Sequence, residues 1–318
     1  MNICILDGST LNPGDLTWEA LESFGTLNIY DRTATHQIVE RSKDADILIV
    51  NKVKLDQSLL KKLPKLKLIC ISATGFDNVD IRAAKDLKIA VCNVKGYSTS
   101  GVAQHVFAQL LSYFNQARTF WSAVDDNKWE SSPDFCFYLD PIEELMGKRI
   151  GIYGFGQIGQ QVAKLALAFG MQVKAVNKYP ERNQMKGVEF VNEEELIAQS
   201  EILSLHIPLS PASAEMVNTQ FLNKMPRNAI LVNTGRGGLI HEQDLANHLH
   251  SNKIRAAFLD VLSAEPPLSN NPLLKTKNCF ITPHVAWASV ESRKRLMQGL
   301  ADNIQAFLAA RSLNRLDI

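Results

Sequence analysis

The segment GIYGFGQIGQQVAKLALAFG (residues 151–170) joins a short apolar run to a helical stripe through three glycines. Gly154, Gly156 and Gly159 form a GxGxxG pattern, which is typical of a dinucleotide-binding turn when it lies between a strand and a helix. The first glycine permits a tight turn, the second lets the backbone approach a pyrophosphate, and the third lets the helix pack closely on the strand. The apolar stripe that follows has helical spacing and consists of Ile158, Val162, Leu165, Ala166 and Phe169. The segment therefore predicts a dinucleotide-binding unit; the alternative is a glycine-rich turn that binds nothing.

Short β-branched runs alternate with helix-patterned stretches on both sides of this segment. The upstream runs are residues 2–7, 27–31, 46–50, 66–72 and 88–94, with helix-patterned residues 56–63 and 80–87 between them. The downstream runs are residues 148–154, 171–177, 188–191, 201–207, 229–235, 255–261 and 279–283. This alternation is typical of an α/β protein with parallel sheets and helices on both faces.

The boundary between two such series is marked by a long helical pattern, residues 100–124, followed by a loop-rich stretch, residues 129–141. The tail, residues 286–310, reads as one more helix, which can return to the first series. We therefore predict two Rossmann-like domains. They are a substrate-binding domain of residues 1–99 plus 286–318 and a dinucleotide-binding domain of residues 100–285.

Composition points to a globular protein of the cytoplasm. The chain has 318 residues, 46% of them hydrophobic, and a formal net charge of +1. Its overall electrostatic field therefore does not favour binding to nucleic acid or to an anionic membrane. The first strand-like run meets Asp7 almost at once, and no apolar stretch approaches the roughly 18 residues of a membrane span, so we expect neither a signal peptide nor a membrane partner. Five cysteines without a CxxC pattern indicate reduced thiols, and the seven histidines have no zinc-like spacing, so we expect no metal.

The next strand of the dinucleotide unit ends in AVNKYP (residues 175–180), where an Asp or Glu usually binds the ribose 2′-hydroxyl. Asn177 can still hydrogen-bond this hydroxyl but carries no charge, and Lys178 adds a cation beside it. The missing acid weakens the case for strict use of NAD without weakening the case for a dinucleotide. A solvated loop lysine is the alternative interpretation of Lys178.

Three chemically active residues follow three strand-like runs of the second series. Arg236, Glu265 and His284 come after residues 229–235, 255–261 and 279–283. Side chains beyond the carboxyl ends of parallel strands converge on the ligand crevice. Arginine can bind a carboxylate in bidentate fashion, histidine can deliver a proton near neutral pH, and glutamate can orient the imidazole. Taken singly, the three could instead be a turn arginine, a helix-start carboxylate and a core histidine.

The segments around these residues resemble the D-isomer-specific 2-hydroxyacid dehydrogenases. They are NTGRGG (233–238), FLDVLSAEPP (258–267) and ITPHVAWAS (281–289). ATGFDNVD (73–80) and NVKGYSTSGVAQH (93–105) resemble the glycerate dehydrogenase, or hydroxypyruvate reductase, branch. The resemblance covers nearly the whole chain. It implies an α/β fold of two Rossmann-like domains with parallel sheets, one flavodoxin-like and one NAD-binding, and an active site in the cleft between them.

The resemblance also implies roles for individual residues. Arg236 would anchor the substrate, Glu265 would pair with His284, and His284 would donate the proton in reduction. Cofactor contacts are implied for Gln157 and Ile158 at the pyrophosphate and for Thr234, Arg236 and Asp260 at the nicotinamide, while His206 would shape the cofactor loop. The substrate carboxylate would meet backbone amides of residues 51–53 and 73–75, including those of Lys52, Val53, Thr74 and Gly75. Two roles stay open for Trp287, covering the substrate or packing at the domain interface. The other five histidines, His36, His105, His241, His248 and His250, read as structural or surface residues.

The implied reaction is NAD(P)-dependent reduction of a small 2-keto acid, such as hydroxypyruvate or glyoxylate. NAD(H) is the expected cofactor, with NADP(H) also accepted, and a homodimer is the expected assembly. A phosphoglycerate dehydrogenase-like enzyme is one alternative. We expect no regulatory domain after residue 318, and this expectation argues against that alternative. A non-catalytic, dinucleotide-sensing protein like the corepressors of this fold is the other; the expected lack of a disordered tail argues against it.

Overall fold

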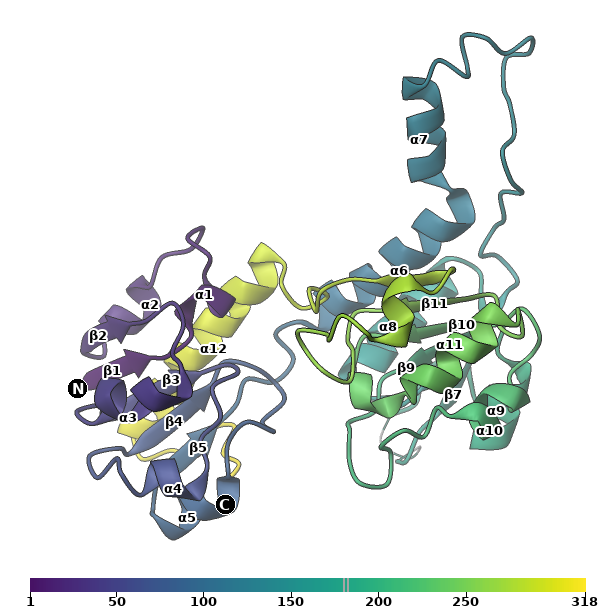
Figure 1. Cartoon of the computed structure of the whole chain (residues 1–318). Helices are drawn as coiled ribbons and strands as arrows, with labels where there is room; N and C mark the ends of the chain where they lie inside the picture. Colours follow the sequence, from purple (N-terminus) through teal and green to yellow (C-terminus); the bar gives the residue numbers. More distant parts are fainter. Residues whose placement is uncertain (180, 182) are drawn as a thin grey trace. The chain divides into compact units, whose positions relative to one another are not determined.

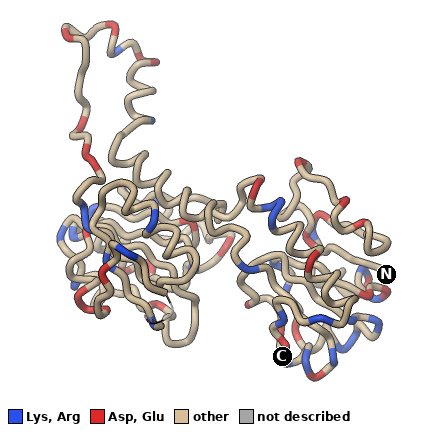
Figure 2. The backbone as a smooth tube through the Cα atoms, turned by 180° about the vertical axis from the view of Figure 1, so that it is seen from behind, with Lys and Arg blue, Asp and Glu red and all other residues tan. Residues whose placement is uncertain are grey.

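The computed structural model describes residues 1–179, 181 and 183–318. The chain forms two compact units, each with one parallel sheet. Unit 1 consists of Met1–Ser98 and Ala288–Ile318, and unit 2 consists of Thr99–Trp287. No helix among the described residues combines the length and the apolar character that crossing a bilayer requires. Acidic and basic residues are interspersed over each unit (Figure 2), as the small net charge suggests.

The sheet of unit 1 has five strands in the order β2-β1-β3-β4-β5, and every pair is parallel. The strands are β1 (Asn2–Ile5), β2 (Thr26–Ile29), β3 (Ile47–Val50), β4 (Leu68–Ile71) and β5 (Ala90–Cys92). All residues of β3 and β4 are buried, which explains why both read as continuous apolar runs. The strand order reverses between β1 and β3, which makes the carboxyl ends of these two strands the switch point of the sheet.

Helices cover both faces of this sheet (Figure 1). They are α1 (Gly8–Leu11), α2 (Glu19–Glu22), α3 (Ile38–Ser42), α4 (Gln57–Leu60), α5 (Ile81–Asp86) and α12 (Val290–Leu308), with a 3₁₀ turn η1 (Thr35–Gln37) before α3. Helices α3, α4 and α5 pack on one face through residues that include Ile38, Leu60 and Ala84. Helix α12 contacts α2 and β4, so the last helix of the chain completes the first unit.

The sheet of unit 2 has seven strands in the order β12-β11-β10-β9-β6-β7-β8, again all parallel. The strands are β6 (Arg149–Tyr153), β7 (Gln172–Val176), β8 (Val188–Phe190), β9 (Ile202–Leu205), β10 (Ile230–Asn233), β11 (Ala256–Leu259) and β12 (Cys279–Ile281). The order reverses between β6 and β9, as in a doubly wound dinucleotide-binding fold. All twelve strands predicted from the sequence are confirmed, each one shorter than its apolar run.

The helices of unit 2 also divide between the two faces of its sheet. They are α6 (Thr99–Asn115), α7 (Ala117–Asp125), α8 (Gln157–Ala168), α9 (Glu193–Gln199), α10 (Thr219–Lys224) and α11 (Glu242–His250), with 3₁₀ turns η2 (Gly237–Leu239) and η3 (Pro272–Lys275). Helices α6 and α8 share one core, and α9, α10 and α11 share the other. Val162 and Ala166 of the predicted stripe are buried, but Phe169 is exposed and stacks on Phe107 with ring centroids 5.2 Å apart.

The prediction of one helix over residues 100–124 is wrong. Gln116 has a φ of +51°, in the left-handed region, so α6 ends at Asn115 and α7 starts at Ala117. A glutamine gives no warning of such a break, because this conformation is usually taken by glycine. Helix α7 and the following segment, residues 126–142, extend away from the sheet as an arm (Figure 1). The arm exposes four large aromatic side chains, those of Trp121, Trp129, Phe135 and Tyr138.

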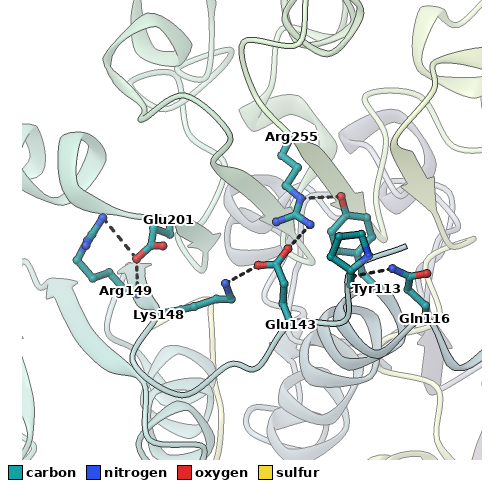
Figure 3. A network of polar contacts seen from close by, with 8 residues as sticks. Tyr113, Gln116, Glu143, Lys148, Arg149, Glu201 and Arg255 are labelled. Carbon is teal, nitrogen blue, oxygen red and sulfur yellow. Dashed lines mark hydrogen bonds and ion pairs between the residues drawn. The ribbon is translucent and has the colours of Figure 1, made fainter. Parts of the chain in front are cut away.

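The base of the arm is held by a polar network on unit 2 (Figure 3). Glu143 binds Arg255 at 2.5 Å and Lys148 at 2.7 Å, and Arg255 also donates to the Tyr113 hydroxyl at 3.0 Å. The Gln116 side chain donates to the carbonyl of Pro141 at 3.0 Å. This hydrogen bond links the segment that enters the arm to the segment that leaves it. The Arg255 guanidinium lowers the pKa of Glu143 to about 2, so this carboxylate stays ionised across the ordinary pH range.

Candidate active site

The glycine-rich turn lies between β6 and α8, as the sequence predicts. Gly154 has a φ of +103°, and a Cβ there would lie 2.7 Å from the carbonyl oxygen of His206. A Cβ on Gly159 would lie 2.2 Å from the carbonyl oxygen of Gly154. Both positions therefore need glycine, the first for its conformation and the second for the close approach of helix and turn.

The N-terminus of α8 fits an anionic group. Gly156 is its N-cap and supplies no capping side chain, and nothing lies within 4 Å of where a Cβ of Gly156 would be. Gln157 is exposed and Ile158 is half-buried in the first turn. Amides at the start of a helix lack partners within the helix, and the helix dipole favours negative charge there. The turn can therefore hold the pyrophosphate of a dinucleotide.

His206 follows β9, the neighbour of β6 at the switch point. Its Nε2 lies 2.8 Å from the Ser204 hydroxyl, and its backbone amide donates to the Tyr153 carbonyl. Burial lowers the pKa of His206 to about 4, so the ring is neutral at pH 7 and is a poor proton donor. The carbonyl oxygen of His206 lies close to Gly154 and leaves no room for a Cβ there. In this way His206 restricts the shape of the glycine-rich turn.

Asn177, one residue beyond β7, organises its own loop. Its Nδ2 donates to the carbonyls of Tyr179 at 3.1 Å and Asn183 at 3.2 Å, and its Oδ1 accepts from the Tyr179 amide at 3.0 Å. Both amide hydrogens are thus engaged, so a contact with a ribose hydroxyl, which stays a prediction, would use Oδ1. Lys178 is exposed, with its ammonium 5.6 Å from the centre of the Tyr179 ring.

His284 and Glu265 form a direct pair. His284 Nδ1 lies 2.6 Å from Glu265 Oε2, and Glu265 Oε1 accepts from the Leu262 amide at 3.2 Å. The side chains are partly accessible, 25% for His284 and 33% for Glu265. The pair lies beyond the carboxyl ends of β11 and β12, where an open parallel sheet binds ligands. An imidazole oriented by a carboxylate in this place can exchange a proton with a bound substrate.

The backbone of His284 is held in an uncommon conformation by Asp260. His284 has a φ of +54°, and its amide donates to the carbonyls of Asp260 and Thr282. The buried Asp260 carboxylate accepts from the amides of Val285 and Ala286, both at 2.9 Å, and from the Thr282 hydroxyl at 2.6 Å. Asp260 thus builds the turn that presents His284; its implied contact with nicotinamide stays a prediction.

Sequence reasoning missed the place of His105. This residue of α6 is half-buried, and its Nε2 lies 3.0 Å from the Thr282 hydroxyl and 3.7 Å from Asp260 Oδ1. The two partners are far away in sequence, so no local pattern could have connected His105 with the His284 turn. Among the remaining histidines, His248 is buried and bonded to Asp244, and His241 caps α11.

Arg236 and Thr234 lie on the turn after β10. Arg236 is half-buried just before η2, and its Nη1 donates to the Gly235 carbonyl at 2.9 Å. The Asn233 side chain ties the turn by bonding the Arg236 carbonyl and the Gly235 amide. The buried hydroxyl of Thr234 has no hydrogen-bond partner among the described residues. Because buried polar groups are normally paired, this hydroxyl fits a polar atom of a bound cofactor.

In unit 1 the predicted substrate residues lie on loops after β3 and β4. The backbone amides of Lys52 and Val53 donate to the carboxylate of Asp7, at 2.6 Å and 3.1 Å. Thr74 is exposed and donates its hydroxyl to the Val94 carbonyl, and Gly75 is half-buried. Trp287 is the half-buried last residue of unit 2. The described residues contain no cluster of three or more His, Cys, Asp or Glu that could hold a metal.

A doubly wound parallel sheet with this turn and with an imidazole–carboxylate pair beyond its strands is the construction of a nicotinamide-dependent dehydrogenase. Residues 107–286 match the family model described as D-isomer specific 2-hydroxyacid dehydrogenase, NAD binding domain. The chain belongs to the family of D-isomer specific 2-hydroxyacid dehydrogenases, which are NAD(P)-dependent oxidoreductases acting on CH–OH groups.

Individual relatives agree with this family. A hydroxypyruvate reductase of Blautia hydrogenotrophica is 42% identical over 318 residues, covering 99% of each chain. A glycerate dehydrogenase of Methylorubrum extorquens is 38% identical over 288 residues, covering 90% of each. Among solved structures, an acyclic imino acid reductase in complex with NADPH and D-Arg matches with a TM-score of 0.86 and 32% identity, covering 99% of this chain and all of that one.

Proposed function

We propose that this chain reduces a small 2-keto acid, hydroxypyruvate or glyoxylate, to the corresponding hydroxy acid. The observation that carries the proposal is the pair of His284 and Glu265, 2.6 Å apart beyond the strands of the NAD-binding domain. The names of the relatives support the substrate class, since they include hydroxypyruvate reductase, glycerate dehydrogenase and glyoxylate reductase.

Each catalytic residue has a distinct task in this proposal. Nδ1 of His284 faces Glu265, so Nε2 is the nitrogen that gives its proton to the carbonyl oxygen of the substrate. The Glu265 carboxylate orients the ring and stabilises its protonated form. Arg236 binds the substrate carboxylate through its planar fork and polarises the adjacent carbonyl. The bound nicotinamide supplies the hydride.

The cofactor is proposed to lie along the carboxyl ends of β6, β7, β9, β10 and β11. Its proposed contacts are Gly154, Gly156, Gln157, Ile158, Gly159, Asn177, Lys178, His206, Thr234, Arg236 and Asp260. The uncapped start of α8 and the unpartnered Thr234 hydroxyl support this assignment. NAD(H) is the proposed main cofactor, and NADP(H) is accepted because position 177 is neutral and Lys178 is cationic. The imino acid reductase structure with NADPH supports this second cofactor.

The substrate is proposed to contact residues of both units. They are Lys52, Val53, Thr74, Gly75, Arg236, His284 and Trp287. The amides of Lys52 and Val53 are bound to Asp7, so their contribution requires the substrate to compete with that carboxylate. Thr74 and Gly75 are therefore the stronger candidates in unit 1.

We also propose a homodimer in the cytoplasm, without nucleic acid or membrane as partner. The exposed aromatic side chains of the arm support self-association, because apolar groups gathered on a surface mark contact sites. A hollow of ≈ 830 Å³ beside α6 and β12, lined by residues that include Ser112, Thr119 and Phe280, lies at the base of the arm. The small net charge supports the absence of a nucleic-acid or anionic-membrane partner.

A turnover assay tests the proposed function. Purified protein is mixed with NADH or NADPH and a panel of 2-keto acids that includes hydroxypyruvate, glyoxylate, pyruvate and 3-phosphohydroxypyruvate, and the loss of absorbance at the nicotinamide band is followed. We expect turnover with hydroxypyruvate or glyoxylate, and we expect His284→Ala to lower it by about 10²- to 10⁴-fold. Cofactor binding without turnover on any keto acid would instead favour the dinucleotide-sensing protein, and preference for the phosphorylated acid would favour the phosphoglycerate dehydrogenase-like enzyme.

A further inference from the structure

Two groups of backbone amides lie beyond the carboxyl ends of the strands in unit 1, and they differ in their surroundings. The first group, Asn51–Val53, follows β3 at the switch point of the sheet. All three amides donate to the Asp7 carboxylate, which follows β1 and is buried. The position where an open parallel sheet would bind an anion is thus filled by an anion of the protein itself.

The second group, Thr74 and Gly75, follows β4 and is shaped by β5. The Ala73 carbonyl accepts from the Val94 amide at 3.1 Å. The Thr74 carbonyl accepts from Nδ2 of Asn93 at 2.6 Å. Two successive carbonyls therefore point toward the β5 side, whereas successive carbonyls in a regular strand point to opposite sides.

The direction of the carbonyls fixes the direction of the amides. In a trans peptide the N–H points opposite to the C=O of the same plane. Because the Ala73 and Thr74 carbonyls both face β5, the amides of Thr74 and Gly75 both face away from it. Two successive N–H groups on one side of the chain form a small concavity that suits an anion. The Asn93 side chain is what turns the second plane.

Asn93 is itself held from several directions. It is 1% exposed, and its carbonyl accepts from Nδ2 of Asn303 on α12 at 2.8 Å. Asn303 is equally buried and accepts from Asn314 at 2.9 Å. Oδ1 of Asn93 has no partner among the described residues, although it is buried. The Asn93 side chain therefore acts only as a hydrogen-bond donor, and the acceptor is the Thr74 carbonyl.

We propose that Asn93 is a positioning residue that holds the Thr74 and Gly75 amides side by side for the carboxylate of the 2-keto acid. The inference rests on the proposed function, since it assigns a substrate group to these amides. Asn93 does not touch the substrate; it acts through the Thr74 peptide plane. The loss of this donor should weaken substrate binding and leave the cofactor unaffected.

The test is Asn93→Leu, which keeps the branched shape and the number of side-chain heavy atoms and removes the donor. We expect KM for the keto acid to rise roughly 10- to 100-fold, the loss of about one hydrogen bond to a charged group. Kcat at saturating substrate and the Kd for NADH should change much less. Asn12→Leu is the matched control, because Asn12 is a buried asparagine of the same unit that donates to a different carbonyl, that of Leu16 at 2.6 Å.

The outcomes separate this inference from the proposed function. Wild-type protein without turnover on any 2-keto acid would refute the proposed function. Wild-type turnover combined with an unchanged KM in folded Asn93→Leu, or with an equal rise in Asn12→Leu, would refute the role of Asn93.

A second measurement tests the inference on wild-type protein, in case Asn93→Leu does not fold. Wild-type protein labelled with ¹⁵N at threonine, glycine and valine is saturated with NADH and titrated with oxamate, a carboxylate that mimics a 2-keto acid. The amide resonances of Thr74 and Gly75 should shift strongly, and that of Val53, bound to Asp7, should shift less. Bound oxamate without a shift at Thr74 and Gly75 would overturn the inference.

Discussion

His284 and Glu265 are joined by a contact of 2.6 Å between Nδ1 and Oε2, although 19 residues separate them in sequence. The contact exists because the loops after two neighbouring strands, β11 and β12, meet at one edge of the sheet. It leaves the other ring nitrogen of His284 for a substrate. The turn built by Asp260 holds the backbone of the same histidine, so the ring is fixed from two sides.

Replacement of His284, the proposed proton donor, should be the most damaging single change. We expect His284→Ala to lower kcat by about 10²- to 10⁴-fold, the usual contribution of general acid catalysis. The Kd for NADH, measured by fluorescence titration, should stay within a few-fold of wild type. Turnover close to wild type would remove His284 from the mechanism.

Glu265→Gln tests the partner of the imidazole. The amide keeps the shape of the carboxylate but cannot stabilise a protonated ring, so kcat should fall by about 10- to 100-fold while the fold is retained. Steady-state kinetics over a range of pH checks this, and a rate–pH profile identical to wild type would contradict the assigned role.

Arg236→Lys tests whether the guanidinium recognises a carboxylate. An ammonium group is a point charge and cannot reproduce the planar fork, so even this conservative change should lower kcat/KM for keto acids at least about tenfold. Thermal melting provides the control. A variant that melts far below wild type would assign Arg236 to the turn after β10 instead of to the substrate.

The cofactor preference should depend on Lys178 more than on Asn177. Asn177 is tied to the carbonyls of Tyr179 and Asn183, so its replacement would disturb the loop for both cofactors. We expect Lys178→Ala to raise KM for NADPH by roughly 3- to 10-fold, the loss of a partly solvated charge pair, with little effect on NADH. Lys186→Ala, an exposed lysine of the same connection between β7 and β8, is the control and should change neither value.

Glu143 should make the stability of unit 2 depend on acid pH. Arg255 lowers its pKa from 4.5 to about 2, so the stabilisation is present above pH 4.5 and is lost as pH falls toward 2. Glu143→Gln should reduce the free energy of unfolding by about 1–2 kcal/mol at pH 7 and by less at pH 3.5. Urea unfolding at the two pH values measures this. Glu189→Gln, which removes a more exposed partner of Lys174, should show almost no effect.

The sequence predicted the central strands well because they are buried on both faces. β3 and β4, for example, consist of apolar residues only, and periodicity alone shows such runs. The positions of Arg236, Glu265 and His284 in the fold could be predicted for a related reason: each residue follows a strand and therefore lies at one edge of the sheet. The pairing of Glu265 with His284 follows from that placement.

The features that could not be predicted depend on contacts between residues far apart in the sequence or on single backbone angles. The left-handed conformation of Gln116 breaks a helical pattern that has no glycine or proline at the break. His105 joins the His284 turn across 177 residues. The occupation of the Lys52 and Val53 amides by Asp7 depends on which strands are neighbours, and the sequence does not state that order.

The return of α12 to unit 1 has a consequence for synthesis on the ribosome. Strands β1–β5 are translated before Thr99–Trp287, and the helix that covers one face of their sheet is translated after it. At usual elongation rates the nascent sheet waits roughly 10–40 s for α12. During that time unit 2 can fold, while the side chains that will meet Leu296, Leu300 and Ile304 remain uncovered. The nascent first unit is thus the part of the chain that would profit from a chaperone, and truncation before α12 should leave unit 2 folded and unit 1 prone to aggregate.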